Sequence, residues 1–152
     1  MATHPIDLPT LATTAGLAAA AAVHARWACG STWPRATNDE LADLVVGRRP
    51  MPPPAASTAV AIALTGAAGS VAIAGHTRGV GVIPTGARRL AQVVAGVLGI
   101  RGVGGLAMAA LGGATSGMEV SEEFRRLDLR FYSPLCLVLG SGAARAARKG
   151  RP

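Results

Sequence analysis

Four apolar stretches account for most of the 152-residue chain, and they constrain its fold more than any other feature. They cover roughly residues 8–29, 54–75, 90–117 and 131–147, with short connections between them. A helix needs about 20 consecutive apolar residues to cross the ~30 Å hydrocarbon core of a bilayer. The pattern therefore predicts an all-α protein: a four-helix transmembrane bundle in a single integral membrane domain over residues 1–152, with spans at about 8–29, 54–75, 90–114 and 131–147.

Two other interpretations of the apolar stretches are weaker. One is a soluble, Ala-rich helical domain, but few charges would remain to coat four helices and few large side chains to fill a core. The other is a secretory signal peptide at the N-terminus. Residues 1–8 carry no Lys or Arg, so the positive region that normally precedes such a peptide is missing. We expect this segment to be retained as the first helix.

The net charge of +7 raises the question of a nucleic-acid partner. The arginines lie mainly at the ends of the apolar stretches, and the few aromatic residues are scattered, whereas a nucleic-acid protein carries a basic face, often with stacking aromatics. We expect the lipid bilayer as partner and no nucleic acid. Lys and Arg are slightly more numerous on the side that would hold both termini, which favours cytoplasmic termini.

The first connection, residues 30–53, predicts a short helix on the membrane surface. Thr37 and Glu40 have the spacing of a capping box, and Gly47 supplies a stop signal. Three apolar residues fall on one helical face between these signals: Leu41, Leu44 and Val45.

The other two connections differ from each other. Residues 76–89 are rich in Gly and Pro, which predicts a tight turn. In the third connection, Ser116 and Glu119 suggest a helix cap, and Glu122 and Arg126 are spaced as an i,i+4 pair. This helix should run into the fourth span, with Pro134 in the first membrane turn or as a kink.

Arg101 is the most distinctive candidate for a functional residue. It lies within the Gly-rich segment 99–105, near the middle of the third predicted span. A charge at that depth costs ~3 kcal/mol or more unless it faces protein, water or a counter-charge. A structural ion pair or a snorkelling side chain is the alternative to a functional role. We expect Asp128 or the end of the second span to lie nearest.

The end of the first span carries a second group of candidates. His24 and Trp27 share a helical face, and Trp33 follows just outside the span. The two tryptophans also suit the aromatic belt at a membrane interface, and His24 suits a structural hydrogen bond. No paired His spacing indicates a metal site, and no cofactor is expected. Cys29 and Cys136 fall on the same membrane side, where two buried free thiols are favoured over a disulfide.

Four motifs along the chain resemble one bacterial family of small membrane proteins, known only as domain of unknown function 3995. They are His24-x-x-Trp27, Gly30-x-x-Trp33-Pro34, Phe124-Arg125-Arg126-Leu127-Asp128 and Tyr132-Ser133-Pro134-Leu135-Cys136-Leu137. The resemblance spans nearly the whole chain and implies four membrane helices and a bacterial membrane location. It implies no activity, so no catalytic residue is carried over from it.

The candidate ligand-binding residues share a predicted location. The end of the first span and the start of the fourth meet at the leaflet of the first and third connections. That leaflet would hold His24, Trp27, Trp33, Asp128 and Tyr132, with Arg101 deeper below. Polar groups gathered inside an apolar wall at one leaflet would form a cavity that opens to one side of the membrane. Helical side chains lean toward their own N-terminus, which argues against Arg101 joining the group.

Three functions are compatible with these residues. The favoured one is a non-enzymatic bundle that assembles with another membrane protein or a second copy, or that binds a lipophilic ligand. Ala91, Ala95 and Gly99 would give it close helix contacts. The alternative is a membrane-embedded enzyme acting on a lipophilic or anionic lipid substrate, with His24 or Asp128 as general acid or base and Arg101 holding an anion. A small transporter is third.

Overall fold

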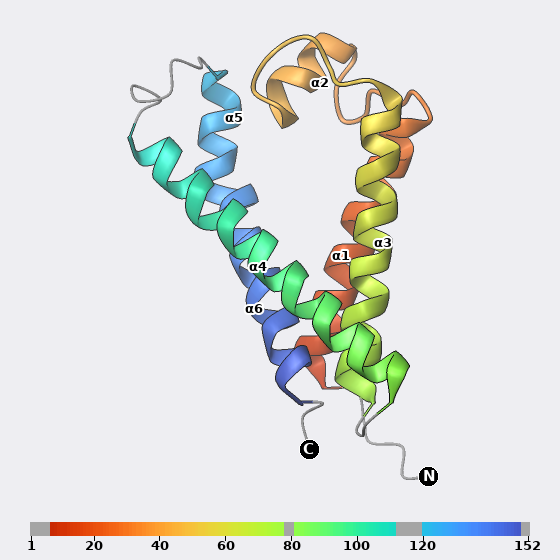
Figure 1. The fold of residues 1–152 in the computed structure, drawn as a ribbon. Helices are drawn as coiled ribbons and strands as arrows, with labels where there is room; N and C mark the ends of the chain where they lie inside the picture. Colours follow the sequence, from red (N-terminus) through yellow and green to blue (C-terminus); the bar gives the residue numbers. More distant parts are fainter. Residues whose placement is uncertain (1–6, 78–80, 112–119, 150–152) are drawn as a thin grey trace.

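A computed structural model describes residues 7–77, 81–111 and 120–149, and in these ranges all the regular secondary structure is helical (Figure 1). The all-α class is therefore confirmed. The elements are α1 (Leu8–Ala28), α2 (Asn38–Val45), α3 (Pro54–His76), α4 (Val82–Ala110), α5 (Glu122–Leu127), the π-helical segment η1 (Asp128–Tyr132) and α6 (Ser133–Lys149). The predicted cap at Ser116 and Glu119 lies outside the described residues.

Three helices are long and apolar enough to cross a membrane: α1, α3 and α4. Two of them match the predicted spans to within a residue or so, because each begins at a proline or next to one and is uniformly apolar. The three helices make the chain compatible with a membrane protein. The helix at the fourth predicted span, α6, has 17 residues and three basic residues in its last five.

α4 begins earlier than the sequence pattern indicates. The Gly and Pro content of residues 76–89 predicts a turn as far as Arg89, whereas the helix begins at Val82. Pro84 lies in its first turn, where backbone N–H groups have no intrahelical partner. A proline there removes no helical hydrogen bond. The connection is thus shorter and the helix longer than predicted.

The helices form two antiparallel pairs that converge at one end. α1 packs along α3, α4 packs along α6, and α3 and α6 make further contacts across the pairs. In Figure 1 the pairs lie together where α1 begins and α6 ends, and they diverge toward α2 and α5. Asp7 joins the convergent end: its carboxylate lies 2.7 Å from Lys149 Nζ, and the hydrogen bond from Lys149 lowers the pKa of Asp7 to about 2. The start of α1 and the end of α6 therefore lie on one side.

Small residues fill the helix contacts. A Cβ atom on Gly140 of α6 would lie 3.3 Å from the carbonyl oxygen of Ala95 and 3.4 Å from the backbone nitrogen of Gly99 on α4. Ala91 is fully buried one turn further along. Ala95 and Gly99 thus let α6 of the same chain approach the α4 backbone closely, and the use of this spacing for assembly with a partner stays a prediction.

Large apolar side chains lie mostly on the outside. On α4, exposed residues recur at helical spacing: Leu90, Val93, Val97, Ile100 and Val103. In water such a continuous apolar surface would drive association. In lipid it is the expected arrangement, because helices there associate through small residues and leave large apolar side chains to the acyl chains.

Candidate functional site

An ion pair links α4 to η1. The guanidinium of Arg101 donates to Asp128, with 2.6 Å between Nη2 and Oδ1, and its Nη1 lies 3.3 Å from the hydroxyl of Ser133. Asp128 is almost fully buried, while 42% of the Arg101 side chain is exposed. Of the two expected neighbours of Arg101, Asp128 is the one that pairs with it, while the Arg101 side chain stays partly exposed.

Glycines make room for this pair. A Cβ atom on Gly105 would lie 2.6 Å from Asp128 Oδ2 and would also overlap Ser133 Oγ and Arg101 Nη1. The Arg101 side chain thus lies over the turn on its C-terminal side, because no Cβ occupies that place. The usual lean of helical side chains toward the N-terminus, which argued against Arg101 joining the other candidates, is therefore not followed here.

The π-helical turn presents Asp128 and Tyr132 to different partners. At its end the Ser133 N–H donates to the Asp128 carbonyl five residues back, and the next residue, Pro134, cannot donate to the helix at all. Such widened turns often occur at functional sites. While Asp128 binds α4, the Tyr132 hydroxyl donates to the carbonyl of Leu44 on α2 at 3.3 Å.

α2 is fixed by both its own sequence and α5. Its capping box is formed as predicted, with Thr37 accepting from the Glu40 N–H and Glu40 accepting from the Thr37 N–H. Gly47, at φ 81°, ends it, and the Ser121 N–H of the α5 cap donates 2.7 Å to the Gly47 carbonyl. The predicted short helix in the first connection is confirmed, and its place on the membrane surface stays a prediction. In α5, Glu122 pairs with Arg125 rather than with the predicted Arg126.

His24, Trp27 and Trp33 form a separate cluster at the end of α1. The indole N–H of Trp27 donates 2.7 Å to the Trp33 carbonyl, and the His24 ring meets the Trp27 ring edge-on at 4.9 Å. His24 Nδ1 lies 3.0 Å from the Ala20 carbonyl in its own helix. The guanidinium of Arg26 lies 5.4 Å from the Trp33 ring. These contacts fix the plane of the Trp27 indole.

The six candidates therefore fall into three groups rather than one: Arg101 with Asp128, Tyr132 with α2, and His24 with the two tryptophans. The physical reason is the divergence of the two helix pairs toward α2, which separates the end of α1 from η1 (Figure 1). Cys29 and Cys136 are both free thiols, but Cys29 is exposed and Cys136 is only partly buried, so the expectation that both are buried is wrong.

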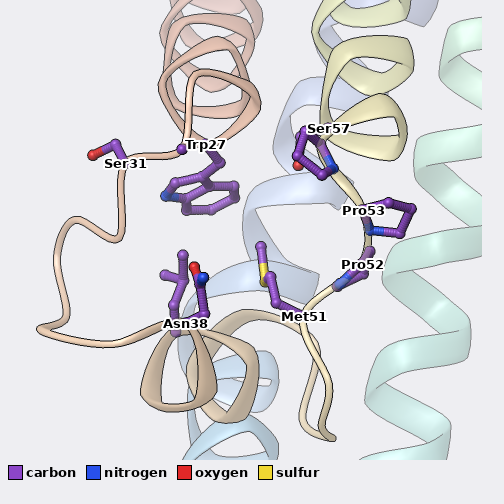
Figure 2. Close-up of a pocket in the computed structure, with 10 residues that line it drawn as sticks. Trp27, Ser31, Asn38, Met51, Pro52, Pro53 and Ser57 are labelled. Carbon is purple, nitrogen blue, oxygen red and sulfur yellow. The ribbon is translucent and has the colours of Figure 1, made fainter.

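A pocket of about 180 Å³ lies beside Trp27, between the end of α1, the first turn of α2 and the start of α3. Figure 2 shows the Trp27 indole over the pocket, with Asn38 on the opposite wall and Met51 extending toward the indole. Of the six candidates, Trp27 alone lines it. The lining residues are Trp27, Gly30, Ser31, Asn38, Leu41, Met51, Pro52, Pro53, Pro54 and Ser57.

Most of this lining, and Ser133, could not be predicted from the sequence. Nothing in the spacing of Met51, the three prolines after it or Asn38 points to a pocket. Ser133 and Gly105 each lie in a segment that the analysis singled out, the Tyr-Ser-Pro motif and the Gly-rich string. Within residues 7–77, 81–111 and 120–149, no three His, Cys, Asp or Glu side chains gather as metal ligands would.

Comparison with known proteins identifies one family. The family described as "Protein of unknown function (DUF3995)" matches residues 11–143, which include both the ion pair and the pocket. No curated protein and no solved structure matches the chain.

Proposed function

The chain belongs to the DUF3995 family of proteins of unknown function, and we propose that it is a non-enzymatic four-helix bundle of the bacterial inner membrane that binds a lipophilic ligand. The bundle crosses the membrane with α1, α3, α4 and α6, and its termini face the cytoplasm. The pocket beside Trp27 is the observation that carries the ligand-binding role.

The continuity of α5, η1 and α6 supports the fourth span. Together they run without a break from Glu122 to Lys149, about 42 Å at 1.5 Å per residue, whereas α6 alone is slightly shorter than a usual span. Arg145 near the cytoplasmic end can snorkel to the headgroups, because its charge lies at the tip of a long apolar stem. The exposed Val138 and Leu135 on the same helix suit contact with lipid.

The position and lining of the pocket support binding rather than chemistry. It lies at the α2 end of the spans, where Trp27 and Trp33 suit the membrane interface. Its walls are mainly apolar, with a few neutral polar groups, as in many small-molecule sites. The lining contains neither a carboxylate nor an imidazole, so it offers no side chain of the kinds most often used as general acid or base.

Assembly with another membrane protein or a second copy is the second candidate. Gly96 and Gly104 lie on the exposed side of α4 with nothing within 4 Å of a Cβ placed on either. Such positions let another helix approach closely in lipid. The ligand role takes precedence because the pocket is already formed within one chain.

Native mass spectrometry of the protein released from a mild detergent tests the ligand role. We expect wild type to carry a lipophilic adduct, and Ser57→Leu to lose it, because Ser57 is buried and lines the pocket that the larger side chain would fill. Ser141→Leu, an exposed position on α6, is the control and should keep the adduct. Adducts that are identical in wild type and Ser57→Leu would contradict binding in this pocket.

A further inference from the structure

We propose that the pocket beside Trp27 takes the hydroxyl head and first carbons of an uncharged lipid, of the diacylglycerol type, in preference to an anionic phospholipid. This inference rests on the proposed ligand-binding function and names the chemistry of the ligand. Three observations support it: the lining is uncharged, nearby arginines already have partners, and the pocket is small and has fixed walls.

Among the residues that the structure describes, no ionisable side chain lines the pocket. Its polar groups are the Asn38 amide, the Ser31 and Ser57 hydroxyls and backbone groups. The segment Pro52–Pro54 supplies three consecutive residues without an N–H, so this wall offers no backbone donors. The Pro53 carbonyl already accepts from the Ala56 N–H, and the Pro54 carbonyl accepts from the Thr58 hydroxyl. A buried anion needs N–H donors or cations around it. A hydroxyl group, which donates one hydrogen bond and accepts others, fits the neutral amide of Asn38 and the serine hydroxyls of these walls.

Three arginines that lie near the pocket residues in the sequence already interact with other side chains. Arg35 forms an ion pair with Glu123 of α5, and Arg26 stacks on the Trp33 ring. Arg49 donates through Nε to Asp43 at 3.0 Å, and this hydrogen bond lowers the pKa of Asp43 and raises the pKa of Arg49. An anionic headgroup would have to compete with these partners.

The apolar part of the ligand would meet fixed walls. The Trp27 N–H is bound to the Trp33 carbonyl, so the indole presents its apolar ring to the pocket in one orientation (Figure 2). Leu41 is 1% exposed and is held by the capped helix α2. The volume of about 180 Å³ is below that of pockets that enclose a whole drug-sized ligand. Only the head and first carbons of a lipid would enter, with its chains in the bilayer.

The chain provides its own reporter for this ligand. It has two tryptophans, and Trp33→Phe leaves Trp27 as the single one while retaining the backbone carbonyl that Trp27 binds. The variant would be reconstituted in phosphatidylcholine vesicles containing a bromine-labelled lipid, which quenches tryptophan fluorescence on contact. The two probes are dibrominated diacylglycerol and dibrominated phosphatidylglycerol with identical acyl chains.

We expect half-maximal quenching at about tenfold lower mole fraction of diacylglycerol than of phosphatidylglycerol. The reason is that burying an uncompensated charge costs more free energy than a tenfold change in affinity represents. Adding Ser57→Leu should remove the difference by filling the pocket, and adding Ser141→Leu should preserve it. One contrary outcome is that phosphatidylglycerol quenches as strongly as diacylglycerol, or more strongly, and that the quenching is lost in Ser57→Leu. This result would overturn the neutral-lipid proposal and leave ligand binding in the pocket intact. Quenching by either lipid that is unchanged in Ser57→Leu would overturn the pocket itself as a binding site.

Discussion

Replacing Asp128 with Asn should lower the free energy of unfolding in detergent micelles by about 3 kcal/mol or more, because it leaves the Arg101 charge without its counter-charge. Asp128 is 4% exposed and accepts directly from Arg101. Equilibrium unfolding followed by helical circular dichroism measures the change. The double variant Arg101→Leu with Asp128→Leu should recover much of the loss, since removing both charges removes the uncompensated one.

Glu122→Gln is the matched control for this prediction. Glu122 pairs with Arg125 at 2.8 Å, but its side chain is 87% exposed, and such surface pairs contribute about 0–1 kcal/mol. A loss in Asp128→Asn no larger than that in Glu122→Gln would show that the pair of Arg101 with the buried Asp128 does not hold α4 against η1.

The second large effect is expected at Gly105. Gly105→Ala should destabilise the fold by about 2 kcal/mol, the usual range for overpacking a tight contact, because the new methyl group would overlap Ser133, Arg101 and Asp128 together. The neighbouring Gly104→Ala should be neutral or stabilising by up to about 1 kcal/mol, because Ala favours the helix more than Gly does and nothing lies within 4 Å of that position.

The same unfolding measurement compares these two glycine variants. Both substitutions change the helix propensity of α4 equally, so their difference reports the space beside each residue. Equal stability of Gly105→Ala and Gly104→Ala would mean that the ion pair can move aside without cost, and that the close approach of η1 to α4 is not required.

Local signals in the sequence were sufficient for several elements. The α2 helix was predicted with its cap and its stop because Thr37, Glu40 and Gly47 act within a few residues of one another. The pairing of Arg101 was predictable because a charge within an apolar span needs a partner, and few carboxylates lie near the spans. The start of α4 was missed because Pro84 is compatible with either a turn or a first helical turn.

The arrangement of the candidate site could not be predicted from the sequence and is seen only in the structure. Short connections indicate which helices are neighbours, but they do not indicate at which end two pairs converge. Leu139 beside Gly16, and Thr13 beside Gly142, bring α1 and α6 together near the termini, not at the His24 end. The pocket depends on how the segment Met51–Pro54 folds beneath Trp27, and no residue spacing encodes that contact.

Cysteine labelling from the two sides of the membrane tests the four-span topology most directly. Cys29 lies at the end of α1 and is exposed, and three proposed spans separate it from Arg148 in the last turn of α6. In a Cys136→Ser background, a membrane-impermeant maleimide added to intact cells should label Cys29. It should label an Arg148→Cys variant, with Cys29 replaced by Ser, only after the membrane is permeabilised. Labelling of both positions from the same side would contradict the account, because α6 would then not cross the membrane.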